Sequence, residues 1–96
     1  MEVIWSPRAS AEFAAQVRYL EQRFGPRQST RYLHEVLAAI EKVLNPLMDF
    51  QLVREQPETR CCPVNKQVKL YYRPGTDSVE LVTFFDTRQS PDKLQL

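Results

Sequence analysis

Residues 68–86, VKLYYRPGTDSVELVTFFD, decide the fold of this 96-residue chain. Apolar residues recur at every second position from Val68 to Tyr72, which is the period of a β-strand with one buried face. Residues 74–77, PGTD, have the composition of a turn. Residues 79–85 then form a nearly continuous apolar run, as in an interior strand that is buried on both faces. The stretch therefore predicts two antiparallel strands joined by a tight turn.

Upstream of residue 46 the apolar period lengthens to that of an α-helix. Ser6-Pro7 is typical of a helix N-cap followed by proline at the first helical position, and the spacing predicts a helix over residues 7–23. Gly25-Pro26 separates it from a second predicted helix, which runs from residue 27 to Asn45 and ends before Pro46.

The second helix carries the stronger apolar stripe. Its members are Leu33, Val36, Leu37, Ile40, Val43 and Leu44. Because these residues repeat at three- and four-residue spacing, they should face the sheet. We expect Leu37 and Ile40 to be almost fully buried.

Three remaining segments complete the predicted topology. Residues 2–5 favour a short N-terminal strand, and residues 61–64 favour a further strand that Pro63 confines to an edge or a bulge. Residues 47–58 predict an irregular connector. We therefore predict a single α+β domain over residues 1–96, of order β-α-α-β-β-β, in which an antiparallel two-helix hairpin packs on a small antiparallel sheet.

Composition excludes several classes of protein. Hydrophobic residues make up 43% of the chain and charged residues 26%, as in a globular domain. No apolar run approaches the about 20 residues that span a bilayer, and the acidic start MEVIWSPRAS does not resemble a signal peptide. Cys61 and Cys62 are adjacent and would point to opposite faces of a strand, so we expect neither a disulfide between them nor a metal site. These features predict a cytoplasmic protein with reduced thiols, no cofactor and no membrane partner.

Basic residues are the main candidates for a functional surface. They are Arg60, Lys66, Lys69, Arg73 and Arg88, with Tyr71 and Tyr72 interleaved. Neighbouring strands of a meander lie about 4.8 Å apart, so such cations can share one face, where they could hold RNA phosphates while the aromatic rings stack on bases. The two-residue period alone also places Lys69, Tyr71 and Arg73 on a solvent face. Spacing leaves both interpretations open.

Residues 84–91, FFDTRQSP, end the apolar run with a carboxylate and a guanidinium two positions apart. Asp86 and Arg88 point the same way in an extended chain, and Pro91 stops the strand. A carboxylate can hold a guanidinium for structural reasons, and a held guanidinium is also suited to grip two oxygens of a partner. We expect Asp86 to orient Arg88 at the rim of the sheet.

Two stretches, VIWSPRASAEF at residues 3–13 and YYRPGTDSVELVTFFDTRQSP at residues 71–91, resemble the RelE/ParE superfamily of bacterial type II toxins. The resemblance covers essentially the whole chain. It is most specific in Trp5-Ser6-Pro7, in the strand Val68–Tyr72 and in Phe85-Asp86-x-Arg88-x-x-Pro91. It implies a toxin, of the kind associated with plasmid stabilisation, that a cognate antitoxin neutralises.

The superfamily contains two activities. RelE-like members cleave mRNA on the ribosome with basic residues on the sheet and often a C-terminal Tyr or His, whereas ParE-like members poison DNA gyrase. The resemblance implies that Arg88, with Arg60 or Lys66, would carry RNA cleavage, but the tail QSPDKLQL contains neither Tyr nor His. This tail and the long helical hairpin favour the gyrase-poisoning branch.

Two alternatives stay open beside gyrase inhibition, namely ribosome-dependent mRNA cleavage and a non-toxic interaction module. A homodimer or a heterotetramer with the antitoxin is compatible with each of them. The residues expected to contact the target or the antitoxin are Arg88, Asp86, Arg73, Lys69 and Tyr71.

Overall fold

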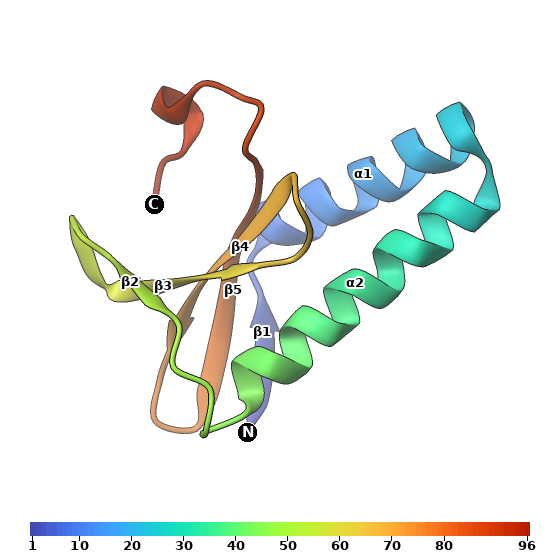
Figure 1. Ribbon diagram of the computed structural model, residues 1–96. Coiled ribbons are helices and arrows are strands. Elements are labelled where there is room, and N and C mark those ends of the chain that lie inside the picture. The colour runs from blue at the N-terminus through green and yellow to red at the C-terminus, as the bar shows by residue number, and fades with distance from the viewer.

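The computed structural model describes residues 1–96 as a two-helix hairpin and a twisted sheet (Figure 1). The elements are β1 (Glu2–Trp5), α1 (Pro7–Phe24), α2 (Pro26–Leu44), β2 (Gln51–Val53), β3 (Gln56–Pro63), β4 (Val68–Pro74), β5 (Ser78–Asp86) and the 3-10 turn η1 (Pro91–Lys93). Neither helix is long and apolar enough to span a bilayer.

The ends of the two helices follow from local chemistry, as predicted. The Ser6 hydroxyl accepts a hydrogen bond from the backbone N–H of Ala9 at 2.9 Å, and Pro7 begins α1. The same hydroxyl donates to the carbonyl of Val82 at 2.8 Å, which ties the start of α1 to β5. Gly25, between the helices, has a φ of 94°, a backbone conformation that residues with a Cβ rarely adopt.

The predicted α+β architecture, a two-helix hairpin packed on a small sheet, is confirmed, but the sheet is mixed and not wholly antiparallel. Its strand order is β1-β5-β4-β3-β2, and β1 pairs with β5 in parallel with Val3 opposite Val79 and Trp5 opposite Leu81. The other neighbours are antiparallel. A four-residue strand carries no local signal of its partner, and only the return of the chain through the helical hairpin brings β1 beside β5.

The predicted irregular connector at residues 47–58 contains all of β2 and the first residues of β3, so this prediction was wrong. β2 is an edge strand of three largely exposed residues and therefore lacks the alternation of a half-buried strand. Pro63 ends β3, which lies inside the sheet and not at its edge. It is tolerated because the pairing with β2 reaches only to Cys61, so no neighbour on that side needs its missing N–H.

The core lies between the helical hairpin and one face of the sheet. Leu70, Leu81 and Val36 are fully buried there. An aromatic group joins three elements, with ring centroids 5.4 Å apart for Trp5 and Phe13, and 5.5 Å apart for Trp5 and Phe84. These contacts fix the first turns of α1 against β1 and β5.

The buried face of α2 overlaps the predicted stripe only in part, since Val36 is buried as expected while Leu33 and Leu37 are exposed. Tyr32, Val36 and Ala39 are buried, whereas Leu37 is 48% exposed and Ile40 is only partly buried, so the expectation for these two side chains was wrong. Leu37 follows the buried Val36 by one residue, a turn of about 100° around the helix, and so lies at the margin of the contact. Leu37→Ala should therefore cost much less stability than a core truncation.

Candidate functional site

Asp86 and Arg88 form a bidentate ion pair at the end of β5. The Arg88 Nη2 donates to Asp86 Oδ2 at 2.7 Å and Nε donates to Oδ1 at 3.1 Å. The backbone N–H of Arg88 also donates to Oδ1, at 2.9 Å. The Arg88 side chain is 61% exposed although it is held, whereas that of Asp86 is 21% exposed. The predicted orientation of Arg88 by Asp86 is present in the structure.

Electrostatics keep this pair ionised. The hydrogen bonds from the Arg88 side chain lower the pKa of the Asp86 carboxyl, against a smaller opposing effect of burial. The same bonds and the Asp86 charge raise the pKa of the Arg88 guanidinium. The pair therefore presents a fixed, fully charged guanidinium to solvent at neutral pH.

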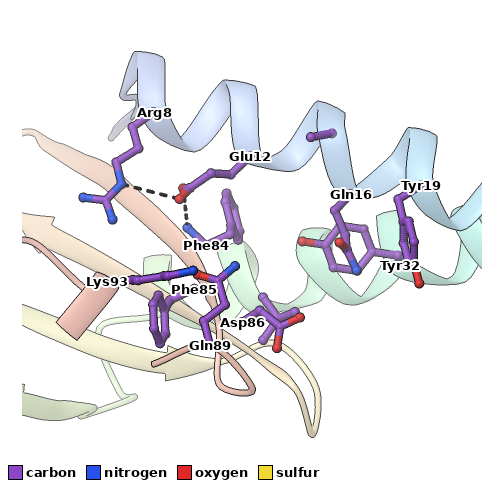
Figure 2. A pocket seen from close by; sticks show the side chains of 12 residues that line it. Arg8, Glu12, Gln16, Tyr19, Tyr32, Phe84, Phe85, Asp86, Gln89 and Lys93 are labelled. Atoms are coloured by element: carbon purple, nitrogen blue, oxygen red, sulfur yellow. Dashed lines mark hydrogen bonds and ion pairs between the residues drawn. The ribbon is translucent and has the colours of Figure 1, made fainter. Parts of the chain in front are cut away.

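The ion pair lies on the helix side of the sheet. Asp86 is opposite Val68 in the antiparallel register, and Val68 belongs to the core beneath the helices. Directly opposed residues share a face, so Asp86 points toward the helical hairpin. There it lines a hollow of about 330 Å³ between α1, β5 and the C-terminal segment, into which Tyr32 of α2 also projects (Figure 2).

Glu12 of α1 closes one wall of this hollow. Its carboxylate accepts hydrogen bonds from the Thr83 hydroxyl at 2.7 Å and from the backbone N–H of Phe84 at 3.0 Å. Arg8 donates to it from one turn earlier, at 3.4 Å (Figure 2). Because β1 ends at Trp5, opposite Leu81, the second half of β5 has no strand on its β1 side, and Glu12 accepts the Phe84 N–H there in place of a strand.

Glu12→Ala should lower the free energy of unfolding by roughly 1–3 kcal/mol, because it leaves the buried Thr83 hydroxyl and the Phe84 N–H without an acceptor. Glu41→Ala, the same change at an exposed position of α2, is the control and should have little effect. Chemical denaturation of both variants measures the difference. Equal stabilities would show that Glu12 does not hold α1 to β5.

The other predicted cations do not gather around Arg88. Lys69, Tyr71 and Arg73 lie on the opposite face of β4, because they alternate with the core residues Leu70 and Tyr72. Arg73 is engaged there, since its Nε donates to the Thr59 hydroxyl at 3.1 Å and its Nη1 lies 3.7 Å from Glu80 Oε1.

Tyr71 is not available for stacking on a base. Its side chain is 9% exposed, and burial, with a smaller contribution from Cys61, raises its pKa to about 12. The phenol therefore stays protonated at neutral pH. Lys69 is exposed and makes no ion pair, so it is the free cation on this face.

Arg60 is on the other face. It is opposite Tyr72 in the register, and its Nη1 donates to Asp49 Oδ1 at 2.6 Å and to the carbonyl of Phe50 at 3.1 Å. Lys66 is exposed in the turn between β3 and β4. The five predicted cations are thus distributed over both faces of the sheet, a turn and the rim, and are not brought together as one patch.

Sequence reasoning missed the helix residues that share the hollow with Asp86, among them Glu12 and Tyr32. A carboxylate next to the apolar stripe of α1 and a tyrosine next to that of α2 were the only local signals. Which strand they would meet depended on the tertiary structure. Burial, with smaller contributions from Glu12, Glu35 and Asp86, raises the pKa of Tyr32, so its hydroxyl stays protonated.

Comparison with known proteins gives one family and several solved structures. The family model described as "ParE toxin of type II toxin-antitoxin system, parDE" matches residues 3–91. No curated protein sequence matches the chain.

Solved structures of similar fold come from several bacteria. A chain of the chromosomal ParDE toxin–antitoxin system from P. aeruginosa superposes with a TM-score of 0.73 at 12% identity, covering 90% of this chain and 95% of that one. A YoeB/ParE toxin from Agrobacterium tumefaciens gives a TM-score of 0.64 at 10% identity, with coverages of 90% and 98%. The YoeB dimer from Staphylococcus aureus gives 0.56 at 14% identity, with coverages of 88% and 93%. At these identities the likeness is one of fold.

Proposed function

Because the chain belongs to the ParE toxin family of type II toxin–antitoxin systems, we propose that this toxin acts by inhibiting DNA gyrase and that a cognate antitoxin neutralises it. The observation that favours gyrase over RNA as the target is that the arginines around the sheet already have carboxylate partners. Arg60, Arg73 and Arg88 are each paired with a carboxylate, at 2.6, 3.7 and 2.7 Å.

Such an arrangement is poorly suited to RNA cleavage. A ribonuclease needs a group that moves a proton and cations that gather around one phosphate. Here the paired arginines lie on different faces, and the nearby Tyr71 is buried with a raised pKa of about 12. The single histidine, His34, is on α2 and not on the sheet. A protein target recognised by surface contacts fits these residues better.

We place the antitoxin on the apolar margin of α2. Leu33 and Leu37 are 39% and 48% exposed, and they lie one turn apart on the same side of the helix. An amphipathic helix can cover such a margin with apolar side chains at the same spacing. Bound there, the antitoxin would sit beside the distal half of the helical hairpin and hinder its approach to a target.

The test uses the purified toxin in a gyrase supercoiling assay, with and without the small protein encoded beside it. We expect loss of supercoiling, restored when the antitoxin is added in equal amount. In cells, induction should cause chromosome breakage while RNA stays intact. Cleaved mRNA with unaffected gyrase would establish the ribosome-dependent nuclease instead, and a harmless, fully soluble chain would establish a non-toxic module.

A further inference from the structure

The distal half of the helical hairpin extends beyond the rest of the fold (Figure 1). We call this segment, residues 18–31, the hairpin tip. Of the hydrophobic residues of the tip, only Leu20 packs against the core. The tip therefore adds little burial to the domain, although ordering its residues costs conformational entropy. An element that contributes so little to the core is a candidate for contact with another molecule.

The tip concentrates positive charge. It contains Arg18, Arg23, Arg27 and Arg31 against the single acid Glu21, a formal charge of +3, whereas the remaining nine cations and eleven acids give the rest of the chain −2. All five of these side chains belong to exposed residues. Only Arg31 has an ion-pair partner, Glu35 at 3.8 Å. The charge is thus not neutralised within the toxin.

Two aromatic rings accompany these cations. Tyr19 is 50% exposed and Phe24 is 56% exposed, and their ring centroids lie 6.4 Å apart, edge to face. The guanidinium of Arg23 lies 5.8 Å from the centre of the Phe24 ring. Half-exposed aromatic rings beside arginines are the composition of a protein-binding hot spot.

The kind of cation distinguishes a protein partner from a nucleic acid. Every cation of the tip is an arginine, and the four lysines of the chain lie elsewhere. Protein interfaces are enriched in arginine and aromatic residues and depleted in lysine, whereas contacts to a phosphate backbone use both cations. A projecting element also buries most surface in a concave partner.

We propose that the hairpin tip is a target-binding surface of this toxin, in addition to the rim, and docks into an acidic recess of a protein, with the arginines on carboxylates and Phe24 at the centre of the contact. The inference rests on the proposed function in taking gyrase as that protein. It adds a target contact on a surface distinct from the Asp86–Arg88 rim. Tyr19 is the one residue of the tip that lines the hollow beside Asp86.

The test compares Arg27→Glu with Arg54→Glu, the same charge reversal at an exposed, unpaired arginine between β2 and β3. Arg27 is in the first turn of α2, where a carboxylate is favoured by the helix dipole, so Arg27→Glu should not lower the melting temperature. We expect its affinity for immobilised gyrase to fall about ten-fold or more, with the difference shrinking as salt rises. Arg54→Glu should bind like the parent. Phe24→Ala should weaken binding without that dependence on salt.

Growth inhibition separates this inference from the proposed function. If the parent slows growth without binding gyrase, the choice of gyrase fails, yet Arg27→Glu must still lose toxicity while Arg54→Glu keeps it. If Arg27→Glu is as toxic as the parent, the inference is overturned. It is also overturned if Arg27→Glu keeps its toxicity but no longer binds the antitoxin. Binding of the parent to a short DNA duplex that Arg27→Glu abolishes would overturn the choice of a protein. A parent that neither binds gyrase nor slows growth would overturn both proposals.

Discussion

Arg88→Ala is expected to remove most of the toxin's growth inhibition while leaving its melting temperature nearly unchanged. The Arg88 side chain is 61% exposed, and its one ion-pair partner is Asp86. Exposed ion pairs add little to stability because solvent screens them and the side chains lose freedom. The substitution removes a guanidinium that Asp86 holds in a fixed direction at the rim, so the expected loss of growth inhibition is that of a contact between the rim and the target.

Two further variants assign the reason for that loss. Arg88→Lys keeps the charge without the planar fork and should retain only part of the activity. Asp86→Asn should act in the same direction as Arg88→Ala but less severely, because its amide oxygen can still accept from the Arg88 backbone N–H while the grip on the side chain is loosened. Growth curves of the induced variants, with thermal melts of the purified proteins, measure both effects.

Other results for Arg88→Ala would assign a different role to the Asp86–Arg88 pair. An Arg88→Ala protein that unfolds would make the ion pair a structural element. One as toxic as the parent would leave the hairpin tip as the only target-binding surface. For an intact but inactive variant, loss of the DNA-damage response indicates gyrase, and loss of codon-dependent mRNA cleavage indicates the ribosome.

Leu81→Ala should lower the free energy of unfolding by roughly 2–5 kcal/mol, the cost of leaving a cavity in a packed core. Leu81 is 0% exposed and lies in β5 between Trp5 and Tyr72, so the truncation removes packing where three strands meet. For a domain of this size the melting temperature should fall by about 10 °C or more.

Leu47→Ala is the matched control, since that leucine is 90% exposed, and its stability should stay close to that of the parent. Urea unfolding should show a lower midpoint for Leu81→Ala with an unchanged slope. A stability loss no larger than that of Leu47→Ala would mean that the strands around Leu81 collapse onto the cavity or that the core is centred elsewhere.

The sequence by itself determined the elements whose limits depend on neighbouring residues. The Ser6 cap with Pro7, and Gly25 with its positive φ before Pro26, set where the helices begin and end through bonds and dihedrals within a few residues. The apolar period set β4 and β5 in the same way. Each of these signals depends only on residues close together in the sequence, so it can be recognised before the tertiary structure is known.

The tertiary structure alone decided which segments meet and which side chains are covered. Nothing within residues 2–5 indicates a parallel pairing with β5, and nothing near Glu12 indicates that it accepts from Phe84, 72 positions later. Register likewise placed Arg60 and Asp86 on the helix side of the sheet and Arg73 on the other side. The exposure of Leu37 followed from the angle at which α2 packs. These choices depend on long-range pairing, in which a shift of one residue moves a side chain to the opposite face, and no local pattern carries that information.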